Sequence, residues 1–454
     1  MPFIPHTQSD IDTMLQAIGE TCTAALFDEI PDDMRFKGEL NLPDSLSEMA
    51  LMRLMQQRAR RDEVALNFVG AGAYEHHIPA AVWDLASRGE FMTAYTPYQA
   101  EASQGTLQLI YEFQTMISRL TRMEVANASV YDGASALAEA MLMAVRANKK
   151  NKSRLILVAG NLNPRYLKAC QAIVKNQGLE LRSVPFSSET GCIEWPVSDL
   201  EDAAALAIAY PNFFGGLDAV DELTTLAHEQ GALVIGVVNP TAMALLKPPG
   251  SWGEQGADIV VGDGQPLGIP LSSGGPYLGF MCCKKQIVRQ MPGRIIGRTE
   301  DSDGTPGFTL TLQAREQHIR RGKATSNICT NQGLLVTAAT IYMSLLGSQG
   351  LREVAVASHK GLGMLRSELA AIGITPRFNG PCFHEQVFEL PVAADAVVNA
   401  LVRESVVPGL SLAFMGERFA HSLLINVTET KTEEDFANLV ALMQSVVKVE
   451  AAQC

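Results

Sequence analysis

Short apolar runs alternate with amphipathic stretches through the middle of the chain. Five of these runs have the length and the β-rich composition of buried strands: 155–158, 181–185, 206–210, 233–238 and 259–261. Apolar residues recur at helical spacing in 165–176 and 217–230, and a further short helix is expected after Pro240. This alternation of strand and helix predicts a mostly parallel sheet with helices on both faces.

Amphipathic helices are also expected before this region. Ser9–Asp12 and Ser45–Glu48 have the spacing of capping boxes, and each predicts the start of a short helix. The segment between these helices, 30–43 (IPDDMRFKGELNLP), is rich in proline and charge and predicts an extended arm. Such an arm can wrap a neighbouring subunit or form a surface tail, and the sequence alone favours neither.

The C-terminal part has a different pattern. A long apolar helix is expected at 334–346, strands at 386–390 and 423–427, and a final amphipathic helix after the capping residues Thr432–Asp435. We therefore predict three parts: N-terminal helices with an extended arm (1–62), a large α/β domain (63–345) and a small α+β domain (346–454).

Composition and charge limit the classes of partner. With 454 residues, of which 47% are apolar and 19% charged, the chain can bury a large domain and a smaller one. The net charge of −13 argues against nucleic acid and anionic membranes as partners. Eight cysteines without CxxC spacing favour reduced thiols over a zinc site or disulfides. The N-terminus lacks the features of a signal peptide, and the most apolar long window, 232–246, is too short for a membrane span, so we expect a cytoplasmic protein.

Two polar stretches stand before apolar helices. The first, 95–105 (YTPYQAEASQG), suits a substrate channel or an interface, and the alternative is a capped, solvated loop. Its candidate site residues are Tyr95, Tyr98, Gln99, Glu101, Ser103 and Gln104. The second, 315–331 (REQHIRRGKATSNICTN), has four basic residues that could bind an anion, pair with an acidic partner or be solvated: Arg315, Arg320, Arg321 and Lys323. Its candidate site residues are Thr325, Ser326 and Asn327.

Two shorter motifs also contain polar or charged residues. His76 and His77 are adjacent and cannot point the same way in a regular element, whereas a helical metal pair needs i, i+4 spacing. We expect them to be polar loop residues near the mouth of a site, and we expect no metal. Asp132 precedes a helix that runs to about Arg146, and it is expected to cap that helix, because a carboxylate there would repel a phosphate.

Residues 258–281 (DIVVGDGQPLGIPLSSGGPYLGFM) combine a short strand, a turn dense in glycine and proline, and a second apolar run. Glycine lets a backbone approach a ligand or another subunit closely, but taken alone this pattern favours a crowded turn without a ligand. Together with YTPYQ and KATSNICTNQ, however, the stretch closely resembles the glycine decarboxylase (P-protein) family of the glycine cleavage system. That family belongs to the fold-type I enzymes that use pyridoxal phosphate (PLP).

The resemblance implies an aspartate aminotransferase-like α/β fold with a smaller C-terminal domain. In active P-protein sequences, a lysine bonded to PLP lies four residues before an apolar residue and a proline. Aligning that pattern on Ile269-Pro270 puts Gln265 at the position of the lysine, and an amide nitrogen is not nucleophilic. Asn239 likewise stands where the family has the aspartate that pairs with the PLP ring nitrogen. The chain therefore resembles the non-catalytic subunit 1 (alpha) of two-subunit P-proteins, with no catalytic or cofactor-binding residue of its own.

The resemblance also implies partners. PLP would be held by a lysine of subunit 2 (beta) in an (αβ)2 heterotetramer, which decarboxylates glycine and passes the aminomethyl group to the lipoyl arm of H-protein. T-protein and L-protein act in the same system. Two alternatives are weighed against this: a stand-alone enzyme with PLP on Lys247 or Lys284, and a purely structural subunit.

Overall fold

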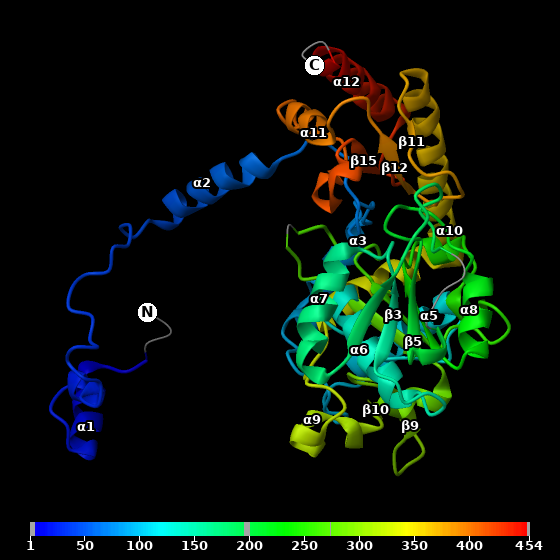
Figure 1. Ribbon diagram of the computed structural model, residues 1–454. Helices are drawn as coiled ribbons and strands as arrows, with labels where there is room; N and C mark the ends of the chain where they lie inside the picture. The colour runs from blue at the N-terminus through cyan, green and yellow to red at the C-terminus, as the bar shows by residue number, and fades with distance from the viewer. Residues whose placement is uncertain (1–4, 195–199, 273, 452–454) are drawn as a thin grey trace. The chain divides into compact units, whose positions relative to one another are not determined.

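The computed structural model describes residues 5–194, 200–272 and 274–451, and the chain forms two compact units, Met1–Glu63 and Val64–Cys454 (Figure 1). The smaller unit contains helices α1 (Gln8–Ile18) and α2 (Glu48–Ala59). Thr7, not Ser9, caps α1, and it forms a capping box with Asp10. The capping side chain of α2 is Ser47 rather than Ser45. Both helices were expected, but their caps lie two residues from the predicted ones: Thr7 has an acid at the capping-box spacing, and Ser47 caps α2 through its hydroxyl alone.

The larger unit is built on a seven-stranded sheet of order β2-β8-β7-β6-β5-β3-β4. Its five parallel strands coincide with the five predicted runs, and β8 pairs antiparallel with both β7 and β2. The strands are β2 (Val125–Ala126), β3 (Leu155–Ala159), β4 (Glu180–Val184), β5 (Ala205–Tyr210), β6 (Leu233–Val238), β7 (Ile259–Asp263) and β8 (Gly279–Cys283). The prediction of a mostly parallel α/β sheet is confirmed.

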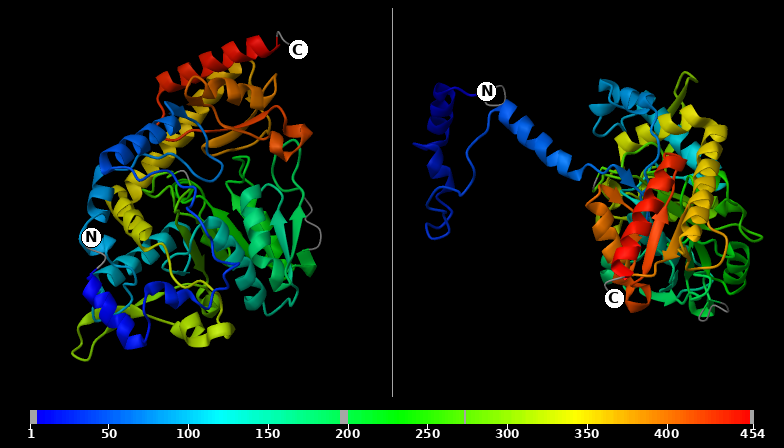
Figure 2. Two further views of the ribbon diagram at one scale, coloured as in Figure 1. Left: turned by 90° about the vertical axis from the view of Figure 1, so that its left-hand side faces the viewer. Right: turned by 90° about the horizontal axis from the view of Figure 1, so that it is seen from above.

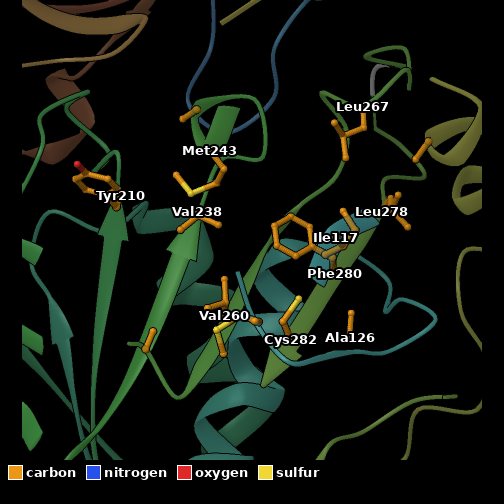
Figure 3. Packing of buried hydrophobic residues seen from close by; sticks show 14 of the residues in the cluster. Ile117, Ala126, Tyr210, Val238, Met243, Val260, Leu267, Leu278, Phe280 and Cys282 are labelled. Atoms are coloured by element: carbon orange, nitrogen blue, oxygen red, sulfur yellow. The ribbon is translucent and has the colours of Figure 1, made fainter. Parts of the chain in front are cut away.

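Helices cover both faces of this sheet. Alternate strand residues enter two separate apolar clusters: Leu155 and Leu157 pack in one, and Ile156 and Val158 in the other. The first cluster includes residues of α5, α8 and α10, and Figure 3 shows Ile117 of α5 with Val260, Phe280 and Cys282. The second includes residues of α6 and α7. The helices are α3 (Ala80–Ala86), α4 (Gly89–Met92), α5 (Gln104–Thr121), α6 (Gly133–Ala147), α7 (Pro164–Val174), α8 (Val220–Glu229) and α10 (Gly333–Ala371).

The C-terminal part has its own antiparallel sheet of order β11-β12-β15-β14, covered by α11 and α12 (Figure 2). The capping box of Thr432 and Asp435 precedes α12, as predicted. The elements here are β11 (Thr375–Pro376), β12 (Glu385–Glu389), α11 (Ala394–Val402), β13 (Val406–Val407), β14 (Leu410–Ser411), β15 (Ser422–Asn426) and α12 (Glu433–Ala451). Short elements complete the fold: β1 (Leu66–Asn67), which pairs with β13, the hairpin β9 (Ile296–Glu300) and β10 (Pro306–Leu310), and α9 (Gln317–Arg320).

Helix α10 is longer than predicted. The expected helix at 334–346 continues to Ala371, with a break at Gly347, whose φ of 60° and ψ of −171° are not helical. The break lies beside the predicted boundary at 345/346, and the division into a large and a small domain there stays a prediction. Among the described residues, α10 alone is long and apolar enough to cross a membrane, but half of its most apolar window is buried in the protein, as in a core helix.

Candidate functional site

A small cavity lies at the carboxyl ends of β5, β6 and β7, where open parallel sheets bind their ligands. Its volume is about 70 Å³, whereas cofactor pockets usually measure about 300–1,000 Å³. Ala209, Val238 and Gly262 line it from the strands, and Tyr74 and Glu385 line it from the opposite side. The cleft that the fold provides is therefore nearly filled by the chain itself.

Gln265 follows β7 and its side chain is buried. Its Oε1 accepts a 2.8 Å hydrogen bond from the Tyr74 amide, and its Nε2 donates at 2.8 Å to the carbonyls of Tyr74 and Ile269. The carboxamide thus pairs with both backbone groups of Tyr74, as a neighbouring β-strand would. Both polar atoms of this side chain therefore already have partners within the chain.

The loop around Tyr74 is also fixed by carboxylates from the C-terminal part. Glu385 on β12 accepts from the Ala71 amide at 2.6 Å and from the Tyr74 hydroxyl at 3.1 Å. Glu429 accepts from the His77 amide at 2.7 Å and lies 2.7 Å from Nδ1 of His76. Burial raises the pKa of Glu385 to about 7, although its two hydrogen bonds oppose the rise. These residues are about 310–350 positions apart in the chain, and together they hold 71–77 against the cleft.

The N-terminus of α6 is occupied by two carboxylates. Asp132 accepts from the Ser135 amide at 2.8 Å, so the predicted cap is confirmed. Asp263, at the end of β7, accepts from the Gly133 amide at 3.1 Å and from the Gln265 amide at 2.9 Å. Burial raises the pKa of Asp263 to about 7, with the charge of Asp132 adding to the rise. Backbone amides at this helix end, which suit an anion, are thus already paired with the chain's own carboxylates.

Asn239 ends β6 beside the cavity. Its Oδ1 accepts from the Thr241 amide at 2.8 Å, and its Nδ2 lies 3.3 Å from Nε2 of His384. Burial lowers the pKa of His384 well below its usual value, so this imidazole is neutral. The side chain of Asn239 therefore caps a turn, and it carries no negative charge of its own that would hold a pyridinium proton.

The residues of the cleft do not fit PLP. No lysine is among its described lining residues, and Gln265 is fully hydrogen-bonded. A phosphate at the start of α6 would meet the carboxylate of Asp263, and the cavity is several times smaller than a cofactor pocket. No chemical step can be assigned to this cleft as it stands.

The candidate residues of 95–105 divide into exposed and internal groups. Tyr95 is 90% exposed, and the side chains of Gln99 and Glu101 are exposed as well. The Tyr98 hydroxyl points into the chain, donating to Asn331 at 2.5 Å, and its ring lies under the guanidinium of Arg294.

The two remaining candidates of this loop lie at the start of α5. Ser103 precedes the helix without a side-chain cap. Gln104 exchanges hydrogen bonds with the backbone of Phe308 in β10. The structure thus brings Tyr98 and Gln104 into internal contacts, and it leaves Tyr95, Gln99 and Glu101 available at the surface.

The second polar stretch is largely tied down. Arg315 is buried and donates to the carbonyls of Met291 and Gly293, so this basic residue is no anion site. The Ser326 hydroxyl donates to Glu139 at 2.9 Å, and the Thr325 amide donates to the Arg315 carbonyl. The remaining members are exposed: Arg320, Arg321, Lys323 and Asn327.

Three residues of the cleft were not among the predicted site residues: Tyr74, Asp263 and Glu385. Tyr74 stands in a motif, NFVGAGAYEHHIP, whose histidines were expected near a site mouth. Asp263 lies within the 258–281 stretch, but nothing in the sequence marks Glu385, one residue before a predicted strand. Across the described ranges, no three His, Cys, Asp or Glu side chains are grouped so that they could hold a metal ion.

Comparisons with known proteins agree with the fold and also identify the family. A family model described as "Glycine cleavage system P-protein" matches residues 1–443. A protein of Thioalkalivibrio sulfidiphilus, named probable glycine dehydrogenase (decarboxylating) subunit 1, is 59% identical over 450 residues, covering 98% of this chain and 99% of its own. A protein of the same name from Alcanivorax borkumensis is 60% identical over 442 residues, covering 96% and 97%.

Solved structures give the same result. The crystal structure of a glycine decarboxylase (P-protein) of the glycine cleavage system, in inhibitor-bound form, superposes with a TM-score of 0.89 at 39% identity, covering 98% of this chain and 100% of that one. An aspartate aminotransferase from Thermus thermophilus shares the fold alone, with a TM-score of 0.56 at 14% identity, covering 85% and 99%.

Proposed function

The chain belongs to the glycine cleavage system P-protein family, and from its cleft we infer that it is the subunit that does not hold the cofactor. In this proposal it is subunit 1 (alpha) of a two-subunit glycine decarboxylase. It assembles with a PLP-bearing subunit 2 (beta) as an (αβ)2 heterotetramer in the cytoplasm. The single observation that carries the proposal is Gln265, which replaces the family lysine and is fully paired within the chain.

The assembled enzyme decarboxylates glycine, releases CO2 and transfers the aminomethyl group to the lipoyl arm of H-protein, in a system that T-protein and L-protein complete. PLP on subunit 2 supplies the electron sink that this decarboxylation requires. In this proposal the present chain has a structural role, because the contacts within its cleft hold the strand ends and the 71–77 loop in place. A rigid scaffold can then present surface residues to a site on the neighbouring subunit.

The exposed residues of 95–105 are the proposed contribution of this chain to that site. Tyr95, Gln99 and Glu101 point away from their own core, and Tyr98 anchors the loop through its bond to Asn331. We expect Gln99→Ala and Glu101→Gln to slow glycine-dependent CO2 exchange about ten- to a hundredfold, because a lost hydrogen bond to a charged group costs roughly 1.5–3 kcal/mol. Normal assembly with unchanged exchange in both variants would assign the loop a structural role only.

A stand-alone enzyme with PLP on another lysine has little support. The Lys247 ammonium is paired with Asp221 at 2.7 Å, outside the cleft. The Lys284 ammonium is paired with Asp258 at 2.7 Å, and Asp258 precedes β7, whereas the cleft lies at the other end of that strand. Both ammonium groups are thus ion-paired, and neither lysine is among the described residues that line the cavity.

Spectroscopy of each chain alone and mixed tests the proposal. We expect this chain with PLP to give no borohydride-reducible band, and the mixture with subunit 2 to give one together with glycine-dependent CO2 exchange. A pyridoxyl group mapped to a lysine of this chain after reduction would refute the assignment. Lys247→Arg and Lys284→Arg, which keep both ion pairs, are the matched variants and should leave the mixture unchanged.

A further inference from the structure

The two polar stretches of the sequence, 95–105 and 315–331, meet at one buried arginine that belongs to neither. Arg294 stands two residues before β9, and its side chain is 13% exposed. Its guanidinium lies 4.8 Å from the centre of the Tyr98 ring. The same guanidinium pairs with Glu316 and donates at 2.9 Å to the Cys329 carbonyl. One side chain therefore joins the first stretch to both ends of the second.

Tyr98 completes this junction through its hydroxyl. The hydroxyl donates to the Asn331 side chain at 2.5 Å and lies 3.1 Å from the Thr330 hydroxyl. Burial raises the pKa of Tyr98, although the Thr330 hydrogen bond and the Arg294 charge oppose the rise, so the phenol keeps its proton for Asn331. The ring is thus bonded through its hydroxyl and stacked on a cation at its face, and the two contacts fix its orientation.

The contacts at this junction require an arginine. A guanidinium is planar and carries five N–H groups, so it can lie over an aromatic ring while its edge donates to a carboxylate and a carbonyl. A lysine ammonium is a compact point charge and cannot make these three contacts at once. The side chain of Glu316 is 9% exposed, and a buried carboxylate that loses its cation is strongly destabilising.

A second contact ties the same loop to the same piece of backbone. Gln104, at the start of α5, exchanges hydrogen bonds of 2.8 Å with the backbone of Phe308 in β10. β10 pairs with β9, which begins two residues after Arg294, and the two strands lie together at one end of the larger unit (Figure 1). The hairpin thus carries both anchors of the loop, Gln104 directly and Tyr98 through Arg294. The exposed side chains at 99–101 lie between these anchors, so the anchors determine where they point.

We propose that Arg294 is a positioning residue for the decarboxylating complex. Through Tyr98 it holds the exposed residues of 95–105 where they reach the site on subunit 2, and it fixes 315–331 beside them. Arg294 itself touches no reacting group and acts only through the loop. The inference rests on the proposed function, in which this loop is part of that site.

The test is a double-mutant cycle on the full-length chain reconstituted with subunit 2 and PLP. Arg294→Met, Tyr98→Leu and the double variant are compared in glycine-dependent CO2 exchange, with assembly measured first by sedimentation velocity. We expect Arg294→Met to lower kcat about tenfold and to leave KM for glycine within about threefold, because a small misplacement of positioned groups acts on the rate. In the Tyr98→Leu background the same substitution should change kcat less than about twofold, since the residue through which it acts is gone. Equal losses in both backgrounds, or a change in KM alone, would overturn the proposal.

Arg294→Lys is the second variant, and it guards against a loss of folding because it keeps a cation for Glu316. It gives up the donor to Cys329, so kcat should fall about threefold with Tyr98 present and stay unchanged in the Tyr98→Leu background. A wild-type kcat, or a loss that is the same in both backgrounds, would again overturn the proposal.

Hydrogen exchange of the isolated chain separates this inference from the proposed function. Amides in 95–103 and in 315–331 should exchange about tenfold faster in Arg294→Met than in the wild type, because one side chain holds both stretches. Arg154→Met is the matched control: Arg154 also donates to backbone carbonyls, those of Gln177 and Gly178, and its loss should leave both stretches and kcat unchanged. Unaltered exchange in 95–103 would refute the role of Arg294. A wild-type mixture with subunit 2 that shows no glycine-dependent CO2 exchange would instead refute the proposed function, and with it the site that Arg294 is proposed to serve.

Discussion

Replacing Gln265 by lysine tests the interpretation of the cleft most directly, because lysine is the residue that the resemblance implies at this position in active P-proteins. The buried carboxamide makes three hydrogen bonds of 2.8 Å with Tyr74 and Ile269. An ammonium can donate to the two carbonyls, but it cannot accept from the Tyr74 amide. The substitution therefore leaves one buried N–H unpaired and introduces a charge into the cleft.

The lost hydrogen bond sets the size of the local destabilisation. An unpaired buried N–H costs about 1–3 kcal/mol. At about 1.4 kcal/mol per tenfold change, the Tyr74 amide should exchange with solvent roughly five- to 150-fold faster. The buried ammonium adds to the loss, although the carboxylate of Asp263 offsets part of it. PLP should still not bind, because Asn239 is neutral and Asp263 still occupies the amides of α6.

The assay is hydrogen exchange of peptides covering 67–78, followed by borohydride reduction with PLP. Gln349→Lys is the matched control, because Gln349 is an exposed glutamine on α10 whose only described hydrogen bond is to Glu353. It should leave exchange in 67–78 unchanged. Unaltered exchange at Tyr74 in Gln265→Lys, or a pyridoxyl group reduced onto residue 265, would refute the reasoning.

Two further predictions concern the same cleft. Burial raises the pKa of Glu385 from 4.5 to about 7, so its protonated form favours folding, and its contribution to stability falls as pH rises from about 4.5 to about 7. The thermal midpoint of the wild-type chain should therefore decrease over this pH range, and Glu385→Gln should remove about half of that decrease. The other half remains because the pKa of Asp263 is raised in the same direction, and a variant whose midpoint depends on pH as the wild type does would contradict the role of Glu385. Gly215→Ala would place a methyl group 1.7 Å from the Glu385 carbonyl oxygen at a φ of +85°, so we expect little soluble protein; Gly363→Ala, which meets nothing within 4 Å, should express normally.

The central strands β3, β5, β6 and β7 were predictable because they are buried on both faces, whereas β4 at the edge of the sheet is partly exposed and the short strand β2 was not predicted. Strands buried on both faces read as continuous apolar runs, and 155–158 and 206–210 match β3 and β5 to within a residue. Helix boundaries were less certain, since Ser9 and Thr7 both have a suitable acid nearby. The extension of α10 beyond 346 was missed because Gly347 reads as a stop, whereas here it marks a break within one long helical stretch.

The site was only partly predictable, for a different reason. The resemblance singled out Gln265 and Asn239; Asn239 lines the cavity, and Gln265 is hydrogen-bonded to Tyr74, which also lines it. The contacts of Glu385 and Glu429 with 71–77 join segments more than 300 residues apart. No local pattern encodes such a pairing. Sequence reasoning could therefore identify what the cleft lacks, but not what closes it.

A glutamine suits the closed cleft because its carboxamide matches a peptide group. Tyr74 presents an N–H and a carbonyl side by side, and only a side chain with both an acceptor and a donor satisfies the two together. Methionine would leave both unpaired, and lysine or glutamate one of them. Asp263 acts similarly at α6, where its carboxylate accepts the Gly133 amide that would otherwise suit a phosphate. Gln265 thus bonds the end of β7 to the 71–77 loop and Asp263 bonds it to α6, so under the proposed function a chain that bound PLP would have to break these contacts.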